Sequence, residues 1–198
     1  MIVVDIEATG TNAQVHSIVS LGAIDLKKPE RQLYLECRRF EGSHIMDGAL
    51  EVNGFTQTEI DDETKMSEAD LFAQFMEWSQ ECDDRTLIGQ NVSFDRAFLS
   101  GSADRAGQQF DLPYRTLDTH TMCYMHMLKH DVTPPFDEQH KRTALNLNAV
   151  LNYCGIPSEP DPHNALTGAK CHAEVASRLL YDKPLLPEFS QFPIPWKN

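Results

Sequence analysis

The sequence lacks long apolar runs of the kind that membrane proteins and secreted precursors carry. No apolar stretch approaches the roughly 20 residues that a membrane-spanning helix needs. The opening segment Met1-Ile-Val-Val is interrupted by Asp5, so it is too short for the apolar core of a signal peptide. We therefore expect a soluble, cytoplasmic protein with no membrane partner.

Paired cysteines are also missing. The five cysteines are odd in number and scattered, and no C-x-x-C pair occurs among them. This spacing argues against a disulfide framework and against a zinc ribbon. Reduced cysteine behaves as a small apolar residue, so we expect most of the five to be reduced and buried.

Positive charge is scarce, because 17 Lys and Arg face 30 Asp and Glu and the net charge is −13. Affinity for nucleic acid of any sequence comes from Lys and Arg that neutralise phosphates, which argues against a surface that coats a long duplex. A short single-stranded end needs only a local basic rim, and carboxylates that hold divalent cations also count as negative in this sum. Acidity therefore limits the footprint on nucleic acid and does not exclude it as a substrate.

The 198 residues are enough for one domain with one core. Residues 1–6, 17–26 and 32–40 have the composition and alternation of strands, and we expect them to be consecutive antiparallel neighbours. Residues 183–198 hold four prolines and are predicted to form a tail that lies over the domain or is partly disordered. This leaves residues 1–182 as the folded domain.

Helical spacing of apolar residues begins after Ser67, whose hydroxyl can cap a helix with Asp70 at the third position beyond it. The same spacing predicts helices over residues 94–106 and 143–153, the second ending at a Gly-Ile-Pro stop. A last helix is predicted to begin near His163. Strands followed by helices indicate a sheet covered by helices.

The first chemical signal is the carboxylate pair Asp5 and Glu7. Residues two apart in a strand point to the same face, so both carboxylates project together from an otherwise apolar segment. They would repel each other unless a cation held them, and oxygen ligands of this kind suit magnesium or manganese. Taken alone, the pair is a weak signal, and such a pair is more often a solvated strand end.

Two further residues carry chemistry only in combination with this pair. Asp95 is predicted near the start of a helix, where the helix dipole alone would favour a carboxylate. His163 begins the last helix after a Pro-rich turn, where most histidines are structural or exposed. Neither position indicates an active site by itself.

The order of the motifs is similar to that of the DnaQ-like exonucleases, the histidine-containing branch of the DEDD superfamily. The motifs are D-x-E-x-T-G from Asp5, N-x-x-F-D-x-x-F-L from Asn91 and H-N-A-L from His163. Further segments resemble landmarks of that family in the same order: Leu21-Gly-Ala-Ile24, Val52-Asn-Gly-Phe-Thr56, Leu117-Asp-Thr119 and Leu147 to Pro157.

The resemblance implies a ribonuclease-H-like α/β fold, a mixed sheet with helices on both sides. It also implies hydrolysis of phosphodiesters at 3′ ends with release of nucleoside monophosphates. By this resemblance Asp5, Glu7 and Asp95 would hold two Mg²⁺ or Mn²⁺ ions, and His163 would remove a proton from the attacking water.

The resemblance extends to substrate contacts. The backbone at Ala8 and Thr9 would meet the terminal nucleotide, and Asn91, Phe55 and Phe94 are candidates for substrate contact, although both phenylalanines are equally expected in the core. The expected partners are single-stranded 3′ ends of DNA or RNA, and a homodimer is left open because relatives include dimers.

One position departs from the family pattern. The fourth metal-binding aspartate is expected five residues after His163, where this chain has Gly168. Loss of a metal ligand should cost at least about 10–100-fold in affinity or activity. Three explanations are open: an inactivating substitution, a natural protein with weakened catalysis and a partly occupied site, or another ligand, for which His172 is the candidate one helical turn later.

Two functions from different classes follow from the sequence. The first is a metal-dependent 3′-to-5′ exonuclease, impaired to the extent that Gly168 weakens its metal site. The second is a non-catalytic nucleic-acid-binding module that keeps the exonuclease fold.

Overall fold

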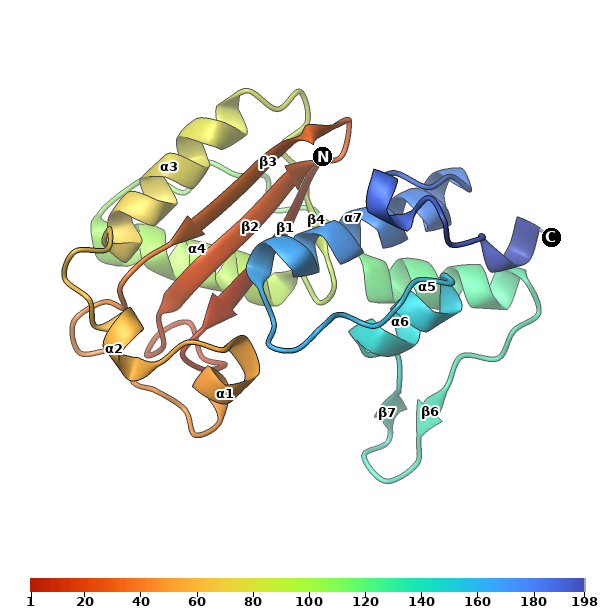
Figure 1. Ribbon diagram of the computed structural model, residues 1–198, viewed down its shortest axis with the longest axis horizontal. Coiled ribbons are helices and arrows are strands. Elements are labelled where there is room, and N and C mark those ends of the chain that lie inside the picture. The colour runs from red at the N-terminus through yellow and green to blue at the C-terminus, as the bar shows by residue number, and fades with distance from the viewer. Residues whose placement is uncertain (198) are drawn as a thin grey trace.

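The computed structural model describes residues 1–197, and its centre is a five-stranded mixed sheet of order β3-β2-β1-β4-β5 (Figure 1). The strands are β1 (Ile2–Ala8), β2 (Ile18–Asp25), β3 (Lys28–Glu36), β4 (Leu87–Gly89) and β5 (Thr116–Asp118). The first three are consecutive antiparallel neighbours, as predicted, while β4 and β5 run parallel to β1. The sheet is therefore mixed.

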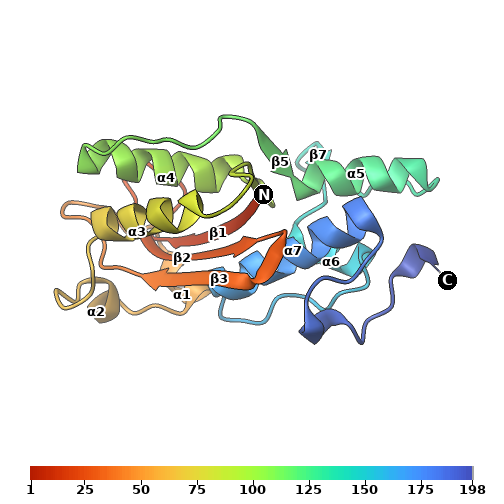
Figure 2. The same cartoon turned by 90° about the horizontal axis from the view of Figure 1, so that it is seen from above.

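Helices cover both faces of this sheet. They are α1 (Ala49–Asn53), α2 (Gln57–Ile60), α3 (Glu68–Gln80), α4 (Ser93–Ala106), α5 (Thr119–Lys129), α6 (Leu147–Tyr153) and α7 (Ala165–Tyr181). Figure 2 shows α3 and α4 on one side of the strands and α7 on the other. None of the helices in residues 1–197 has the length and apolar character to cross a membrane.

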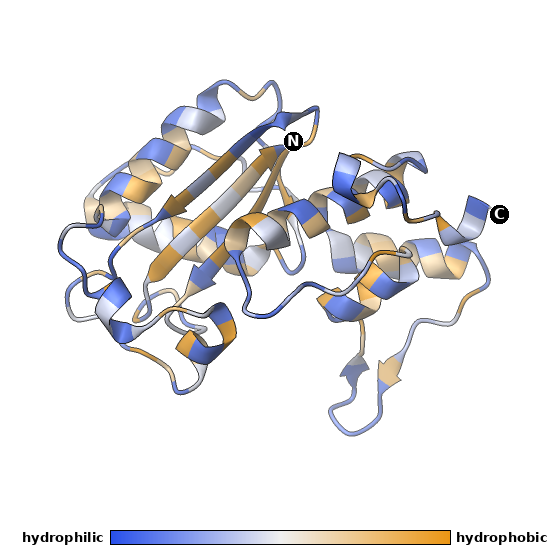
Figure 3. Ribbon diagram, in the orientation of Figure 1, coloured by the Kyte–Doolittle hydropathy of each residue, from blue (hydrophilic) through white to orange (hydrophobic). Residues whose placement is uncertain are grey.

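Alternation along β1 distributes its residues between the two faces. Ile2, Val4 and Ile6 join the apolar cluster formed with α3 and α4, whereas Val3 packs with the alanines of α7. Strand β2, between β3 and β1, is buried along its whole length, and Figure 3 shows apolar residues along it. By the same alternation, Asp5 and Glu7 belong to the face that α7 covers.

The first turn of α7 lies unusually close to the sheet. A side chain on Gly22 of β2 would overlap the backbone of Ala165 and lie 2.5 Å from Cα of Leu166. Glycine is therefore needed at this crossing. The close approach brings the N-terminal half of α7, including Gly168, against β1.

Capping agrees with the sequence at several helices. The hydroxyl of Ser67 accepts the backbone N–H of Asp70, and the Asp70 carboxylate accepts the backbone N–H of Ser67, which completes the predicted capping box. The last helix begins at Ala165, where the Asn164 side chain accepts two backbone N–H groups.

The prediction of a helix over residues 143–153 was wrong at its start. Residues 142–143 form strand β7 (Arg142–Thr143), which pairs with β6 (Phe136–Asp137) in a small hairpin. The helix begins only after Asn146, whose side chain caps it by accepting the backbone N–H of Ala149. Asparagine competes for backbone groups, so it favours a helix start over a helix interior.

The C-terminal segment packs on the domain, which is one of the two expected outcomes. The guanidinium of Arg178 is wholly buried, pairs with Glu174 at 2.7 Å, and donates to backbone carbonyls of the segment. These carbonyls belong to Phe189, Phe192 and Pro193. Asn198, the last residue of the predicted tail, lies outside the described residues.

All five cysteines are buried and free, as predicted. Three of them belong to a second apolar cluster formed by α5, α6 and α7, and the remaining two lie in the cluster under α3 and α4. Burial raises the pKa of the Cys123 thiol to about 11. The cysteines therefore serve as packing residues.

Candidate active site

Three carboxylates from two elements meet at the end of β1. Asp5 and Glu7 project from β1, and Asp95 projects from the first turn of α4, where it is 3% exposed. Asp95 Oδ1 accepts the backbone N–H of Ile6 at 3.1 Å. Because β4 pairs with β1 only at Ile2 and Val3, the N–H of Ile6 is free for this contact. The predicted convergence of the three residues is present.

Burial and mutual repulsion raise the pKa values of all three carboxylic acids. Burial, followed by the charges of Asp95, Glu7 and Glu159, raises the pKa of Asp5 well above its ordinary value. Burial also raises the pKa of Asp95, which two backbone hydrogen bonds partly oppose. The pKa of Glu7 rises to about 7, through burial and the charge of Glu159. Each acid is therefore hard to ionise without a nearby cation.

The donor set fits a divalent cation. No Lys or Arg among residues 1–197 forms an ion pair with Asp5, Glu7 or Asp95. Carboxylate oxygens are hard ligands of the kind that Mg²⁺ and Mn²⁺ prefer. In the described part of the chain these side chains do not form a preformed cage of three or more ligands around one point. They lie close enough for their charges to act on one another, and a cation between them would relieve this repulsion.

Gly168 occupies the position that the family pattern predicts for a fourth carboxylate. A Cβ atom on Gly168 would overlap Oδ2 of Asp5, and it would lie 2.8 Å from Cγ of Asp5 and 3.2 Å from Oε1 of Glu159. The fourth position therefore faces the site, although it carries no ligand.

Glu159 was not identified from the sequence, and it belongs to this cluster. It lies in the loop between α6 and α7, is only 9% exposed, and its Oε1 is buried without a hydrogen-bond partner in residues 1–197. Burial raises the pKa of Glu159, while the imidazole of His163 and the backbone N–H of Asn164 oppose the rise. An acidic residue in an irregular Pro-rich loop has no periodicity that would have revealed it.

His163 lies at the rim of the cluster, just before α7. Its backbone N–H donates to the carbonyl of Val52 at 2.9 Å, which attaches the loop to the end of α1. Its side chain is 39% exposed, with Nε2 3.8 Å from Asp161 Oδ1. The ring lines a cavity of about 230 Å³ together with Tyr34 and Phe55. The imidazole is therefore accessible from solvent beside the carboxylates.

His172, the candidate replacement ligand, is not a surface residue. It is 2% exposed and lies beside the backbone of Val4 and Gly89. Burial lowers the pKa of His172 to about 4, and its ring makes no hydrogen bond to Asp5 or Glu159 in residues 1–197. We find no contact that supports the proposed replacement.

A shallow groove runs beside the carboxylates. It has a volume of about 150 Å³ and is lined by Glu7, Ala8, Asn53 and Phe94, among others. Asn53 Nδ2 donates to the carbonyl of Ala8 at 3.2 Å and thereby holds the groove floor. The groove brings two of the predicted substrate residues, Ala8 and Phe94, next to the acidic cluster.

The remaining predicted substrate residues have mixed positions. Phe55 lines the same cavity as His163, with the ammonium of Lys65 5.1 Å from its ring centre. The side chain of Thr9 is buried, and its hydroxyl donates to the His44 carbonyl at 2.7 Å. Asn91 is exposed before α4, in a left-handed conformation with φ 53°. The predicted contact of the Thr9 backbone with substrate was wrong, because the whole residue is buried, its N–H donates to the Ser17 carbonyl and its carbonyl accepts the N–H of Met46.

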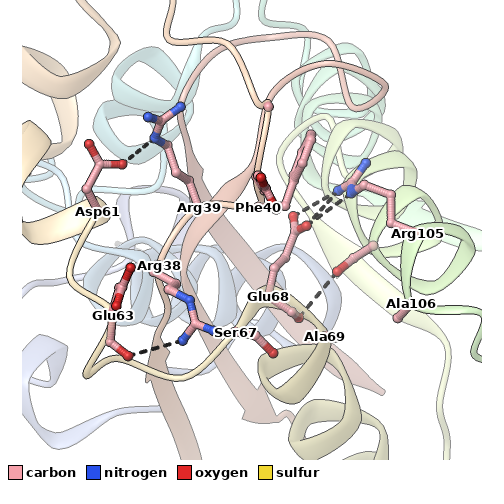
Figure 4. Close-up of a pocket in the computed structure, with 13 residues that line it drawn as sticks. Arg38, Arg39, Phe40, Asp61, Glu63, Ser67, Glu68, Ala69, Arg105 and Ala106 are labelled. Carbon is pink, nitrogen blue, oxygen red and sulfur yellow. Dashed lines mark hydrogen bonds and ion pairs between the residues drawn. The ribbon is translucent and has the colours of Figure 1, made fainter.

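A larger cavity of about 590 Å³ lies apart from the acidic cluster and contains none of its residues. Figure 4 shows that its guanidinium groups already have acceptors: Arg39 pairs with Asp61, Arg105 pairs with Glu68, and Arg38 donates to a backbone carbonyl. Paired cations bind phosphate less readily than free ones, so this cavity is a weak candidate for a nucleic-acid site.

Comparison with known proteins gives matches over most of the chain. The family model RNase_T, described as exonuclease, matches residues 2–176. Ribonuclease T of Escherichia coli K12 is 25% identical over 133 residues, which cover 60% of this chain and 61% of the relative. Ribonuclease T of Klebsiella pneumoniae is 28% identical over 133 residues, with the same coverage of 60% and 61%. The match spans less than two thirds of these relatives.

Solved structures share the fold. Exonuclease I of E. coli in complex with a dT13 oligonucleotide superposes with a TM-score of 0.70 and 16% identity, covering 92% of this chain and 41% of that chain. The nuclease domain of 3′hExo, a DEDDh family member bound to rAMP, gives a TM-score of 0.69 and 16% identity, covering 93% of both chains. These likenesses confirm the predicted fold class, a mixed sheet flanked by helices.

Proposed function

Because this chain belongs to the exonuclease family, as the resemblance of its motifs predicted, we propose that it is a metal-dependent 3′-to-5′ exonuclease. It hydrolyses phosphodiesters at single-stranded nucleic-acid ends and releases nucleoside monophosphates. The observation that carries the proposal is the meeting of Asp5, Glu7 and Asp95 around one space, with His163 at its rim.

The structural neighbours support this substrate class. One neighbour was solved with a single-stranded oligonucleotide, dT13, and another with a nucleoside monophosphate, rAMP. A terminal nucleotide in the groove beside Glu7 would contact the backbone of Ala8 and the ring of Phe94. Asn53 lines both this groove and the cavity that contains Phe55 and His163.

Each residue has a role that follows from its position. Asp5, Glu7 and Asp95 would hold the Mg²⁺ or Mn²⁺ ions, which would supply polarisation of the scissile phosphate and stabilisation of the leaving oxygen. The imidazole of His163 accepts the proton of the attacking water, because it is the exposed base next to the carboxylates. The walls of the groove orient the 3′-terminal nucleotide.

Partners and location remain predictions from the sequence. We propose that the chain works in the cytoplasm, and its association into a homodimer is to be measured by the mass of the protein in solution. DNA and RNA ends are both compatible with the groove, because no residue is assigned to the 2′-hydroxyl.

The proposal is tested by incubating the chain with oligonucleotides labelled at the 3′ end, in Mg²⁺ or Mn²⁺. We expect release of labelled mononucleotides, which a phosphorothioate bond at the 3′ end blocks and one at the 5′ end does not. Asp95→Asn should reduce the rate by at least 100-fold, while the exposed control Glu51→Gln should not.

The alternative is a non-catalytic module that binds single strands through the same groove. It is supported if the chain binds the oligonucleotide but releases no mononucleotide in either metal. Gly168→Asp separates a disabled enzyme from a binding module: activity that appears only in this variant would indicate that the family site is intact except at this residue.

A further inference from the structure

Residue 168 is a glycine and offers no metal ligand, but the carboxylate of Glu159 lies close to it. Oε1 of Glu159 lies 3.2 Å from the position that the Cβ atom of a residue 168 would take. Asp5 Oδ2 overlaps the same position. The space that an aspartate at 168 would fill is therefore shared by Asp5 and Glu159.

Glu159 is buried without a partner that would explain its burial. The residue is 9% exposed, and Oε1 is fully enclosed and makes no hydrogen bond in residues 1–197. A buried carboxylate oxygen without a partner costs free energy unless a cation or proton satisfies it. Oε1 of Glu159 and Oδ2 of Asp5 both lie next to the position that a Cβ atom on Gly168 would take. The unpartnered oxygen of Glu159 therefore faces the same space as Asp5.

We propose that Glu159 supplies the fourth carboxylate of the metal site, in place of the aspartate expected at position 168. The inference rests on the proposed function, and it deepens it by completing the ligand set as Asp5, Glu7, Asp95 and Glu159. The glycine and the glutamate belong together, because a side chain at 168 would crowd Glu159 and would need the carboxylate of Asp5 to turn aside. The site is rearranged and keeps its four carboxylates.

The geometry of the loop favours Glu159 over His172. The loop between α6 and α7 is attached close to the site through the hydrogen bond of His163 to Val52. Oε1 of Glu159 therefore lies at the space in front of Gly168. The His172 ring instead lies beside Val4 and Gly89, under α7.

The inference is tested by metal binding in the absence of nucleic acid. Mn²⁺ is titrated by calorimetry at pH 8 into the wild-type chain, Glu159→Gln and Asp161→Asn. Asp161 is the matched control, because it removes one negative charge from the same loop and its side chain is 95% exposed. We expect Glu159→Gln to weaken Mn²⁺ binding on the order of 10–100-fold, and Asp161→Asn to leave it within about twofold.

A carboxylate exchange provides a second test, which does not depend on the stability of one variant. Glu159→Ala should lose Mn²⁺ affinity, and Glu159→Ala combined with Gly168→Asp should recover at least tenfold of it. Gly168→Asp alone should not improve on the wild-type chain, because Glu159 already holds the place. Circular dichroism verifies that each variant is folded.

The results separate this inference from the proposed function. If Glu159→Gln binds Mn²⁺ as tightly as the wild-type chain, or if the exchange recovers nothing, the inference is overturned whether or not the chain is a nuclease. If Glu159→Gln weakens Mn²⁺ binding but the wild-type chain releases no mononucleotides, the inference stands and the exonuclease proposal fails.

Discussion

At the scale of single residues, the proposed metal site is a group of acids placed where they are difficult to ionise. Burial and neighbouring carboxylates raise the pKa of Glu7 from its ordinary value of 4.5 to about 7, and those of Asp5 and Asp95 also rise. Protons and divalent cations therefore compete for the same oxygens. The affinity for metal should increase as the pH rises through 7.

The raised pKa of Glu7 should make the free energy of unfolding depend on pH. Because its pKa is higher in the folded chain, the folded state holds a proton that the unfolded state releases between pH 4.5 and about 7. Stability from Glu7 is present below pH 4.5, falls as the pH rises, and is fully lost above pH 7. In a chelator, Glu7→Gln should therefore be more stable than the wild-type chain at pH 8, by about 1–3 kcal/mol, but not at pH 4.5.

Urea unfolding of both chains at the two pH values measures this difference. The comparison between the chains removes the contribution of other titrating groups, including His172, whose pKa is lowered to about 4. Adding Mg²⁺ at pH 8 should stabilise the wild-type chain and reverse the order. Equal stability of both chains at pH 8 without metal would contradict the raised pKa.

At the scale of elements, the site depends on how closely α7 approaches the sheet. Gly22 permits the contact, because any side chain there would overlap Ala165 and Leu166. The first turn of α7 carries Gly168 and follows directly on the loop that carries Glu159 and His163. A displaced α7 would therefore separate the carboxylates.

Gly22→Ala should cost about 1–3 kcal/mol of unfolding free energy and at least tenfold in Mn²⁺ affinity, because α7 must move away from β2. Gly42→Ala is the control. Gly42 has φ +81° and open space around it, so alanine there costs about 1–2 kcal/mol of backbone strain without touching α7. Thermal unfolding and Mn²⁺ titration of both variants measure the two effects. Unchanged metal binding in Gly22→Ala would contradict the role of the close approach.

At the scale of the whole molecule, the C-terminal segment is joined to the core through Arg178. Its buried guanidinium pairs with Glu174, whose second oxygen accepts the backbone N–H groups of Leu185 and Leu186. Trp196 stacks on Tyr153 of α6 with ring centres 5.4 Å apart. The segment therefore contributes to folding, although the sequence marks it as a tail after residue 182.

Truncation after Asp182 should lower the free energy of unfolding by about 3–5 kcal/mol, because the buried charges of Arg178 and Glu174 lose their backbone partners. Denaturant unfolding of the full chain and the truncated chain measures this loss. Truncation after Ile194, which keeps the partners of Arg178, should cost much less. If residues 1–182 unfold with the same free energy as the full chain, the C-terminal segment does not stabilise the domain, and this prediction is wrong.

Local pattern alone determined a large part of this protein. The alternation of β1 places Asp5 and Glu7 on one face, and the capping box starts α3 at Glu68. These features depend on periods of two or about four residues, which are visible in the sequence. The family motifs added the order in which these elements carry chemistry.

Only the tertiary structure decided which groups complete the site. Asp95 reaches the N–H of Ile6 because β4 stops after three residues, and Glu159 reaches Gly168 because its loop is attached to α1. Both contacts join residues that are distant in sequence or lie in irregular backbone, where no periodicity indicates a neighbour. The carboxylate pair of β1 was therefore predictable from the sequence, whereas the position of Glu159 beside Gly168 was not.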